Sequence, residues 1–165
     1  MTVSTIYVIN EQMDLGELYS DRTLVTNENA GLSKEPDGTF VTWRSFKSGR
    51  ARLVRREDRH GQFMEIRGRP DWGLEILSRW TVQKDIKVLG ERYHRGRIPE
   101  YWLIDAQGDD ILFQVLIWRK SGYVAVKPRN GWHKSQVFGC SFRLTRRRNR
   151  LGRWQYALEV QQPRG

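Results

Sequence analysis

Two acidic residues and a lysine have the types and contexts that metal-dependent hydrolysis needs. Asp37 lies in EPDGTFV, Glu75 in PDWGLEIL and Lys84 in VQKDIK. Two carboxylates on adjoining strands can converge on one Mg²⁺ or Mn²⁺ ion, because a hard cation binds oxygen ligands and keeps water molecules for the reaction. A nearby lysine can stabilise the charge that develops on a phosphate, or orient the attacking water. The three residues predict hydrolysis of a phosphodiester.

Each of these residues also has an ordinary structural interpretation. Asp37 stands in Pro-Asp-Gly, where its side chain could satisfy the backbone of a turn. Glu75 lies in an otherwise apolar strand, so its charge needs a partner or a metal ion unless that face is solvated. Lys84 and Lys87 could be ordinary lysines on the surface of a helix. The spacing of the residues alone does not decide between these readings.

The elements that would position these residues are strands followed by one helix. Residues 39–43 and 62–66 are predicted strands. In a third strand, 72–77, the residues alternate, with Trp72, Leu74 and Ile76 on one face and Gly73, Glu75 and Leu77 on the other. Because the sheet is mixed with a helix rather than closed on itself, an all-β barrel is not expected.

The helix is predicted from Thr81, a suitable N-cap, to the region of Gly96. Its apolar stripe has helical spacing and consists of Val82, Ile86, Leu89 and Tyr93. Lys84 and Lys87 lie off that stripe and share a second face. A buried strand at 101–105 and several β-rich stretches from Ile111 onward follow. This order predicts an α/β or α+β fold with a β-rich C-terminal part.

Length and composition exclude several classes of protein. The 165 residues favour a single domain over 1–165, and the lone Cys140 excludes an internal disulfide and a four-cysteine zinc site. The three histidines form no metal-ligand motif, and there is no phosphate-binding glycine loop. We find no apolar run that could span a membrane and no signal-peptide pattern at Met1. We therefore expect no membrane partner and a cytoplasmic location.

The net charge of +10 is concentrated in two blocks. Residues 43–60 contain seven basic and two acidic residues, and residues 141–154 contain six arginines and no acid. Such blocks could neutralise phosphates, which favours a nucleic-acid partner, although basic side chains also protect strand edges from pairing. The strongest candidates for phosphate contact are Arg146, Arg147 and Arg148.

Taken together, the motifs resemble the Uma-type family of restriction endonucleases, a branch of the PD-(D/E)XK nuclease-like superfamily. The resemblance covers roughly residues 18–145 and rests on motifs in the family's order. They are Pro36-Asp37 before a strand, Pro70-Asp71 before WGLEILS, the Lys84–Asp85 pair, Tyr93, and IPEYWLID at 98–105.

The resemblance implies a restriction-endonuclease-like mixed sheet flanked by helices, and Mg²⁺-dependent cleavage of DNA. It implies that Asp37 and Glu75 bind the metal ion. It also implies that Lys84 is the catalytic lysine, supplied from the helix because Leu77 occupies the ExK position of the strand. Lys87 would replace Lys84 if Lys84 points outward. A homodimer is compatible with this picture, because paired subunits are common.

The chain departs from the family pattern in three places. Arg79 and Trp80 replace the usual proline and serine after the strand of Glu75, and Leu89 stands where many relatives have a lysine. The family's longer N-terminal helical segment, which supplies an acid, is shortened here; Glu11, Asp14 or Glu17 would have to replace that acid. The alternative is therefore a catalytically silent nucleic-acid-binding or structural member of the same fold.

Overall fold

The centre of the molecule is a six-stranded mixed sheet. The computed structural model describes residues 10–20, 22–59, 61–81 and 83–163. The strand order of the central sheet is β1-β4-β7-β8-β9-β10. β7 and β8 are parallel, and the other neighbours are antiparallel. The strands are β1 (Gly16–Ser20), β4 (Gly38–Thr42), β7 (Trp72–Ile76), β8 (Glu100–Asp105), β9 (Leu112–Arg119) and β10 (Gly122–Ala125).

One face of the central sheet packs against a helix and a second sheet. Helix α3 (Gln83–Arg95) connects β7 to β8, because two parallel strands need a crossover connection. The second sheet has the order β3-β2-β6-β5. Its strands are β3 (Leu32–Lys34), β2 (Thr23–Asn27), β6 (Gly61–Gly68) and β5 (Ala51–Asp58), with the short helices η1 (Glu28–Ala30) and α2 (Trp43–Lys47) beside them.

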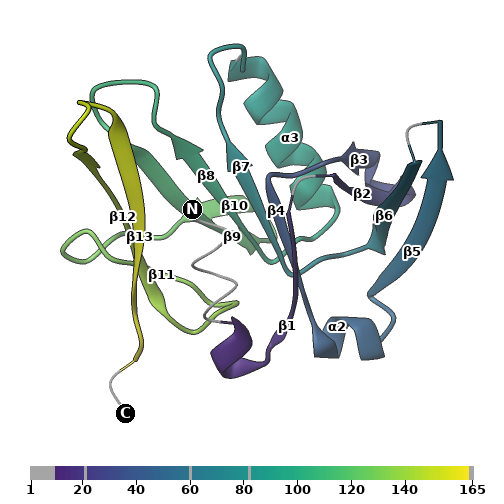
Figure 1. Ribbon diagram of the computed structural model, residues 1–165. Coiled ribbons are helices and arrows are strands. Elements are labelled where there is room, and N and C mark those ends of the chain that lie inside the picture. The colour runs from purple at the N-terminus through teal and green to yellow at the C-terminus, as the bar shows by residue number, and fades with distance from the viewer. Residues whose placement is uncertain (1–9, 21, 60, 82, 164–165) are drawn as a thin grey trace.

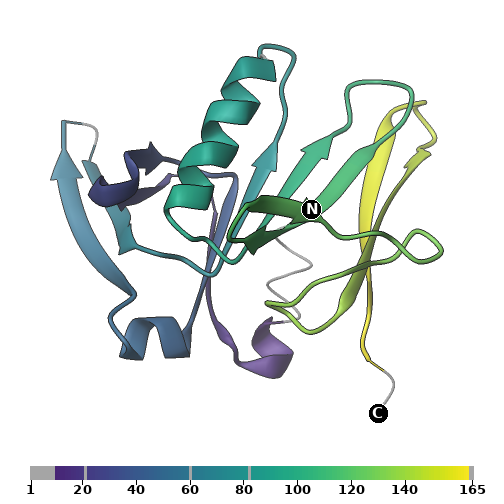
Figure 2. The same ribbon diagram turned by 180° about the vertical axis from the view of Figure 1, so that it is seen from behind.

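A three-stranded sheet packs on the opposite face. Its strands are β11 (His133–Lys134), β12 (Ser141–Arg148) and β13 (Trp154–Gln161). Figures 1 and 2 show the β12–β13 hairpin on one side of the central sheet and the β5–β6 hairpin on the other, with α3 between them. The fold is thus the predicted α+β class with a β-rich C-terminal part. One flank, however, is a small sheet where helices were expected.

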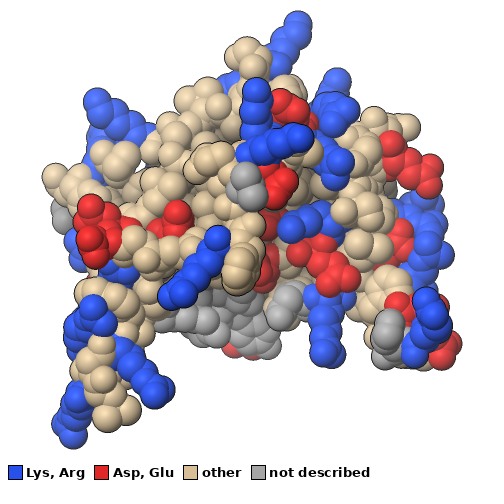
Figure 3. All heavy atoms as spheres, turned by 90° about the horizontal axis from the view of Figure 1, so that it is seen from above, with Lys and Arg blue, Asp and Glu red and all other residues tan. Residues whose placement is uncertain are grey.

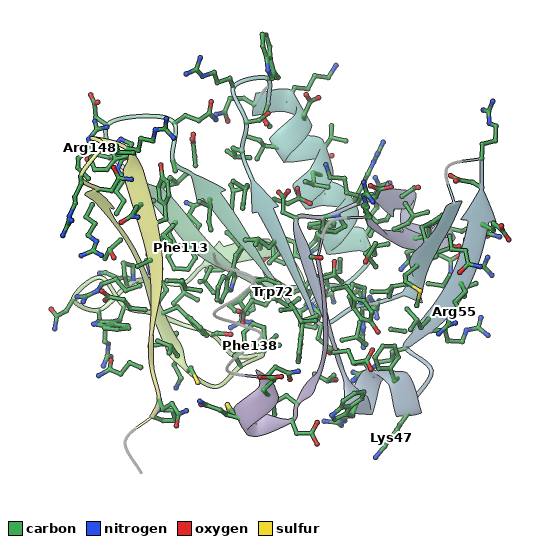
Figure 4. The ribbon with its side chains drawn as sticks, viewed as in Figure 1. Lys47, Arg55, Trp72, Phe113, Phe138 and Arg148 are labelled. Carbon is green, nitrogen blue, oxygen red and sulfur yellow. The ribbon has the colours of Figure 1, made fainter. Side chains whose placement is uncertain are left out.

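Two apolar clusters lie on the two faces of the central sheet. The cluster under the three-stranded sheet is aromatic, and Trp102 packs 5.2 Å from Trp72 and 4.8 Å from Phe142, measured between ring centroids. Trp72 and Phe138 lie close together in the middle of the molecule in Figure 4. The cluster under α3 contains Val25, Val41, Ile66, Tyr93, Tyr101 and Leu103.

Strand β7 belongs to both clusters. Trp72 and Leu74 are fully buried in the aromatic cluster, whereas Gly73 and Glu75 face Tyr93 of α3. The Tyr93 ring lies directly over Gly73, where a Cβ would be 3.7 Å from the ring, in ordinary van der Waals contact. The alternation predicted for this strand is confirmed.

A buried carboxylate connects the C-terminal sheet to the central one. Glu100, at the start of β8, is 0% exposed. Its Oε1 accepts hydrogen bonds from Trp102 Nε1 and Ser135 Oγ, both at 2.7 Å. Its Oε2 accepts from the backbone N–H groups of Gln136 at 2.9 Å and Val137 at 3.3 Å. Burial raises the pKa of Glu100, and these donors counteract that rise.

The apolar stripe predicted for the helix is present in α3 as far as it is described. Ile86 and Leu89 pack against the cluster that contains Tyr93, whereas Val82 lies outside the described residues. Among the described helices, none is long and apolar enough to cross a membrane.

Candidate functional site

Asp37 and Glu75 meet where β4 begins and β7 ends. The two strands are antiparallel with Gly38 opposite Leu74, and the Asp37 N–H donates to the Leu74 carbonyl at 3.0 Å. Asp37 directly precedes β4, and its side chain lines the same hollow as the side chain of Glu75. The two carboxylates are close enough for the charge of Asp37 to raise the pKa of Glu75. The backbone therefore brings together two carboxylates that are far apart in the sequence.

Each carboxylate is oriented by a donor from a neighbouring element. Asp37 Oδ2 accepts from the backbone N–H of Ile76 at 2.7 Å. Glu75 Oε1 accepts from the Tyr93 hydroxyl at 2.5 Å, and Lys34 Nζ lies 3.8 Å from Glu75 Oε2. Among the described residues, the side chain of Asp37 thus hydrogen-bonds to β7, across the strand pair, and not to its own Pro-Asp-Gly turn. Its side chain is held where β7 leaves the sheet.

The electrostatics of Glu75 distinguish it from a surface carboxylate. Glu75 is 6% exposed, and its pKa is raised to about 7, chiefly by burial. This value already includes the lowering effects of the Tyr93 hydrogen bond and the Lys34 ammonium and the raising effect of the negative charge of Asp37. Burial also raises the pKa of Tyr93 well above its usual value, so the hydroxyl keeps its proton and remains a donor. A cation close to Glu75 would favour the ionised carboxylate.

The two carboxylates line a hollow of about 550 Å³ between the β3 end, the β7 end and α3. Figure 3 views this side of the molecule from above and shows acidic side chains in the middle, with lysine and arginine side chains around them. The charged residues that line the hollow are Lys34, Glu35, Asp37, Glu75, Asp85 and Arg92.

The lysine beside the carboxylates is Lys34. It lies at the end of β3, lines the hollow and pairs with Glu75. Lys84 and Lys87, the predicted catalytic lysines, are not among the lining residues; Lys87 lines a different hollow, formed by α3 and β8–β10. Leu89 does line the site, at the position where the family pattern has a lysine. Lys34 was missed because a single lysine in a short strand carries no pattern.

The donor set fits one hard divalent cation. Asp37 and Glu75 supply carboxylate oxygens, and Mg²⁺ is commonly held by one or two carboxylates while water and substrate phosphates complete its coordination. Asp37 Oδ1 forms no hydrogen bond with the described residues, so it is available as a ligand. In the described part of the chain, no group of three or more His, Cys, Asp and Glu is arranged to hold a metal ion. A metal site here would rest on two protein ligands.

The three arginines predicted to contact phosphate differ in their surroundings. Arg146 donates to backbone carbonyls of the 106–109 loop, and its guanidinium lies 4.1 Å from the centre of the Trp154 ring. Arg148 stacks on the same ring at 3.8 Å. Arg147 is exposed. Arg146 is therefore committed to contacts within the protein, and phosphate contact by the other two stays a prediction.

Comparison with known proteins supports the fold. Neither a protein-family model nor a curated protein sequence matches the chain. The crystal structure of a "putative nuclease belonging to DUF820" from Anabaena variabilis is similar, with a TM-score of 0.55 and 18% sequence identity. The similarity covers 83% of this chain and 69% of that one. At this identity the comparison shows that the two chains share a fold.

Proposed function

We propose that this chain is a Uma-type nuclease that hydrolyses phosphodiester bonds of DNA, with Mg²⁺ or Mn²⁺ held by Asp37 and Glu75. The observation that carries the proposal is the pair of carboxylates in one hollow beside Lys34. A bound divalent ion would neutralise charge on the scissile phosphate and lower the pKa of a water molecule. The nuclease-like fold supports the same conclusion.

The protein's own contribution is to hold the two carboxylates in place before substrate arrives. The Ile76 N–H fixes one oxygen of Asp37, and the Tyr93 hydroxyl fixes one oxygen of Glu75. Asp37 thereby keeps Oδ1 for a cation, and Glu75 offers Oε2, which pairs with Lys34 at 3.8 Å until that ammonium group moves to the substrate. Groups positioned in advance on strands and helices need little rearrangement during the reaction, which is where most of the rate enhancement in phosphoryl transfer originates.

Lys34 is proposed as the catalytic lysine in place of a helix lysine. Its side chain is 43% exposed, so it can move from Glu75 to a phosphate oxygen when substrate enters the hollow. There an ammonium group stabilises the negative charge that develops in the transition state. Lys34 of β3 thus supplies the positive charge that a lysine of the helix supplies in the family pattern, at the position that Leu89 occupies here.

Lys34→Met is expected to lower the rate of DNA hydrolysis by about 100-fold, the usual cost of removing one group that stabilises transition-state charge. Lys34→Arg should restore part of the rate because it keeps the charge. The measurement is nicking of supercoiled plasmid and cleavage of single-stranded DNA with Mg²⁺. Lys84→Met and Lys87→Met are matched controls that should leave the rate nearly unchanged. If only Lys84→Met or Lys87→Met lowers the rate, the catalytic lysine lies on the helix, as predicted from the sequence.

The ion pair between Lys34 and Glu75 also favours a second candidate function. If Lys34 neutralises Glu75 permanently, the chain is a catalytically silent nucleic-acid-binding protein of the same fold. Calorimetric titration of the wild-type protein with Mg²⁺ and Mn²⁺ separates the two functions. Binding of either ion supports the nuclease, whereas the absence of binding together with retained DNA affinity supports the silent protein.

A further inference from the structure

The β12–β13 hairpin is a ribbon whose far end carries basic side chains and no acidic one. Eight opposed pairs run from Ser141–Gln161 to Arg148–Trp154. The near half packs on the aromatic cluster through Phe142 and Leu158. The far end, residues 147–153, contains four arginines and no acid, and we call it the arginine tip. Nothing in the proposed hydrolysis by Asp37 and Glu75 uses this segment.

The backbone of the arginine tip is fixed by its own turn. Asn149 Oδ1 accepts hydrogen bonds from the N–H groups of Leu151 and Arg153, both at 2.9 Å. The Asn149 N–H donates to the Arg153 carbonyl at 2.9 Å, and Gly152 takes the positive φ of 72° that the turn requires. The tip therefore presents its side chains from one defined conformation.

The stem below the tip is also held in place. Trp154 stacks with both Arg146 and Arg148, and Arg146 is anchored to the 106–109 loop of the central sheet. Cation–π contacts and hydrogen bonds of this kind restrict the rotation of the two guanidinium groups. The ribbon is thus held in a fixed position against the body of the protein.

The other arginines of the tip form no ion pair with an acidic side chain among the described residues. Arg147, Arg150 and Arg153 are exposed, and among the described residues none of them forms an ion pair. Arg147, Arg148 and Arg150 line a hollow of about 520 Å³ together with Asn149 and Gln155. Guanidinium groups held close together repel one another, and an anion between them relieves that repulsion. Their planar forks match the oxygens of a phosphate.

The tip lies on the same side of the molecule as the candidate active site. In Figure 1 the far end of β12–β13 and the N-terminal end of α3 both point upward, and the C-terminal end of β5 rises on the other flank. Figure 4 places Arg148 at this upper end and Lys47 of α2 at the lower end. A nucleic acid lying along the upper side would contact the tip and pass over the hollow between the hairpins.

We propose that the arginine tip binds the phosphate backbone of duplex DNA and holds the duplex across the hollow of Asp37 and Glu75. A duplex is favoured because it is stiff and spans separated contacts without being ordered first. The major groove of B-DNA admits a two-stranded ribbon, whereas that of A-form RNA is too narrow for side chains to enter. The position over the hollow rests on the proposed function; the binding itself does not.

The test measures binding without hydrolysis. Fluorescence anisotropy with a short labelled DNA duplex in EDTA gives the affinity at several salt concentrations. Arg147→Gln/Arg150→Gln should weaken binding on the order of tenfold at low salt and flatten the slope of log affinity against log salt by about 2, since each phosphate contact contributes about 0.9. Arg147→Lys/Arg150→Lys keeps both charges and should retain most of the affinity and slope.

The matched control is Arg44→Gln/Lys47→Gln on α2, which removes the same charge from exposed positions at the other end of the molecule. The proposal is overturned if both glutamine pairs weaken binding equally, which would indicate net charge alone. It is also overturned if single-stranded DNA or duplex RNA binds as tightly with the same dependence on the tip. If DNA binding depends on the tip but the protein cleaves no DNA with Mg²⁺, the proposed role of the tip is supported and the proposed nuclease function is wrong.

Discussion

Replacing Glu75 by glutamine is expected to abolish the binding of Mg²⁺ and Mn²⁺ and to lower hydrolysis on the order of a thousandfold. A bound cation is worth several kcal/mol of transition-state stabilisation, and 1.36 kcal/mol corresponds to a factor of ten. Glutamine keeps the length of the side chain and a carbonyl oxygen that can accept from Tyr93. The loss would therefore report the missing charge. Calorimetry measures the loss of metal binding, and plasmid cleavage measures the loss of hydrolysis. Equal metal affinity of the wild type and the variant would show that Glu75 does not bind the metal ion.

The same substitution should change how stability depends on pH. The folded-state pKa of Glu75 is about 7, against 4.5 for an exposed glutamate, so the folded protein binds the proton more tightly than the unfolded chain. The resulting stability is present below pH 4.5 and is lost as the pH rises to about 7. The difference of about 2.5 in pKa corresponds to at most about 3 kcal/mol. Glutamine does not titrate, so the variant keeps this stability.

Urea unfolding of the metal-free proteins tests that expectation. The measured quantity is the free energy of unfolding of Glu75→Gln minus that of the wild type, in one buffer below pH 4.5 and another above pH 7. Between the lower and the higher pH, the free energy of unfolding of the variant should increase relative to that of the wild type by up to about 3 kcal/mol. A difference that does not change with pH would show that Glu75 titrates normally. A group that costs stability in order to stay ionisable is typical of a functional site.

Glu100→Ala is expected to cost about 3 to 5 kcal/mol of unfolding free energy. The substitution leaves two buried side-chain donors and two part-buried backbone N–H groups without their acceptor, and each unsatisfied group costs about 1 to 3 kcal/mol before water or rearrangement compensates. The donors are Trp102 Nε1, Ser135 Oγ and the N–H groups of Gln136 and Val137. The loss should appear in chemical unfolding and as a change in the near-ultraviolet circular dichroism of the tryptophans.

Glu100→Gln is the matched variant for that prediction. A glutamine carbonyl can still accept from Trp102 and Ser135, but its NH₂ group would then face the donors at Gln136 and Val137. Its cost should therefore fall between those of wild type and alanine. If alanine costs less than about 1 kcal/mol, the carboxylate is not what connects the two sheets.

The parts of the fold predicted from the sequence have strong local patterns. The alternation of β7, the apolar stripe of α3 and the apolar run of β8 are all visible in a single stretch, residues 72–105. Asp37 and Glu75 were expected on adjoining strands, and the strand after Asp37 is indeed the neighbour of the strand with Glu75. Glu100, by contrast, was named only as part of a motif, and its buried hydrogen bonds could not be read from the sequence.

The parts that were missed depend on long-range pairing. β5 (ARLVRRED) was interpreted only as a basic block, because Ala51 is its one buried residue and no alternation of apolar and polar side chains marks it as a strand. β2 pairs in parallel with β6 across 41 positions, from Thr23–Met64 to Thr26–Arg67, and no local signal predicts such a partner. The role of Lys34 follows from the position of β3, which that pairing determines. Arg146 was assigned to phosphate because the sequence does not show the carbonyls that it binds.

The site is assembled from parts that leave the ribosome at different times. Lys34 and Asp37 are synthesised well before Glu75, and the Tyr93 hydroxyl that orients Glu75 comes later still. An N-terminal fragment that ends before Tyr93 lacks part of this set. A nascent polypeptide therefore cannot form this arrangement until α3 has left the ribosome and packed against β7.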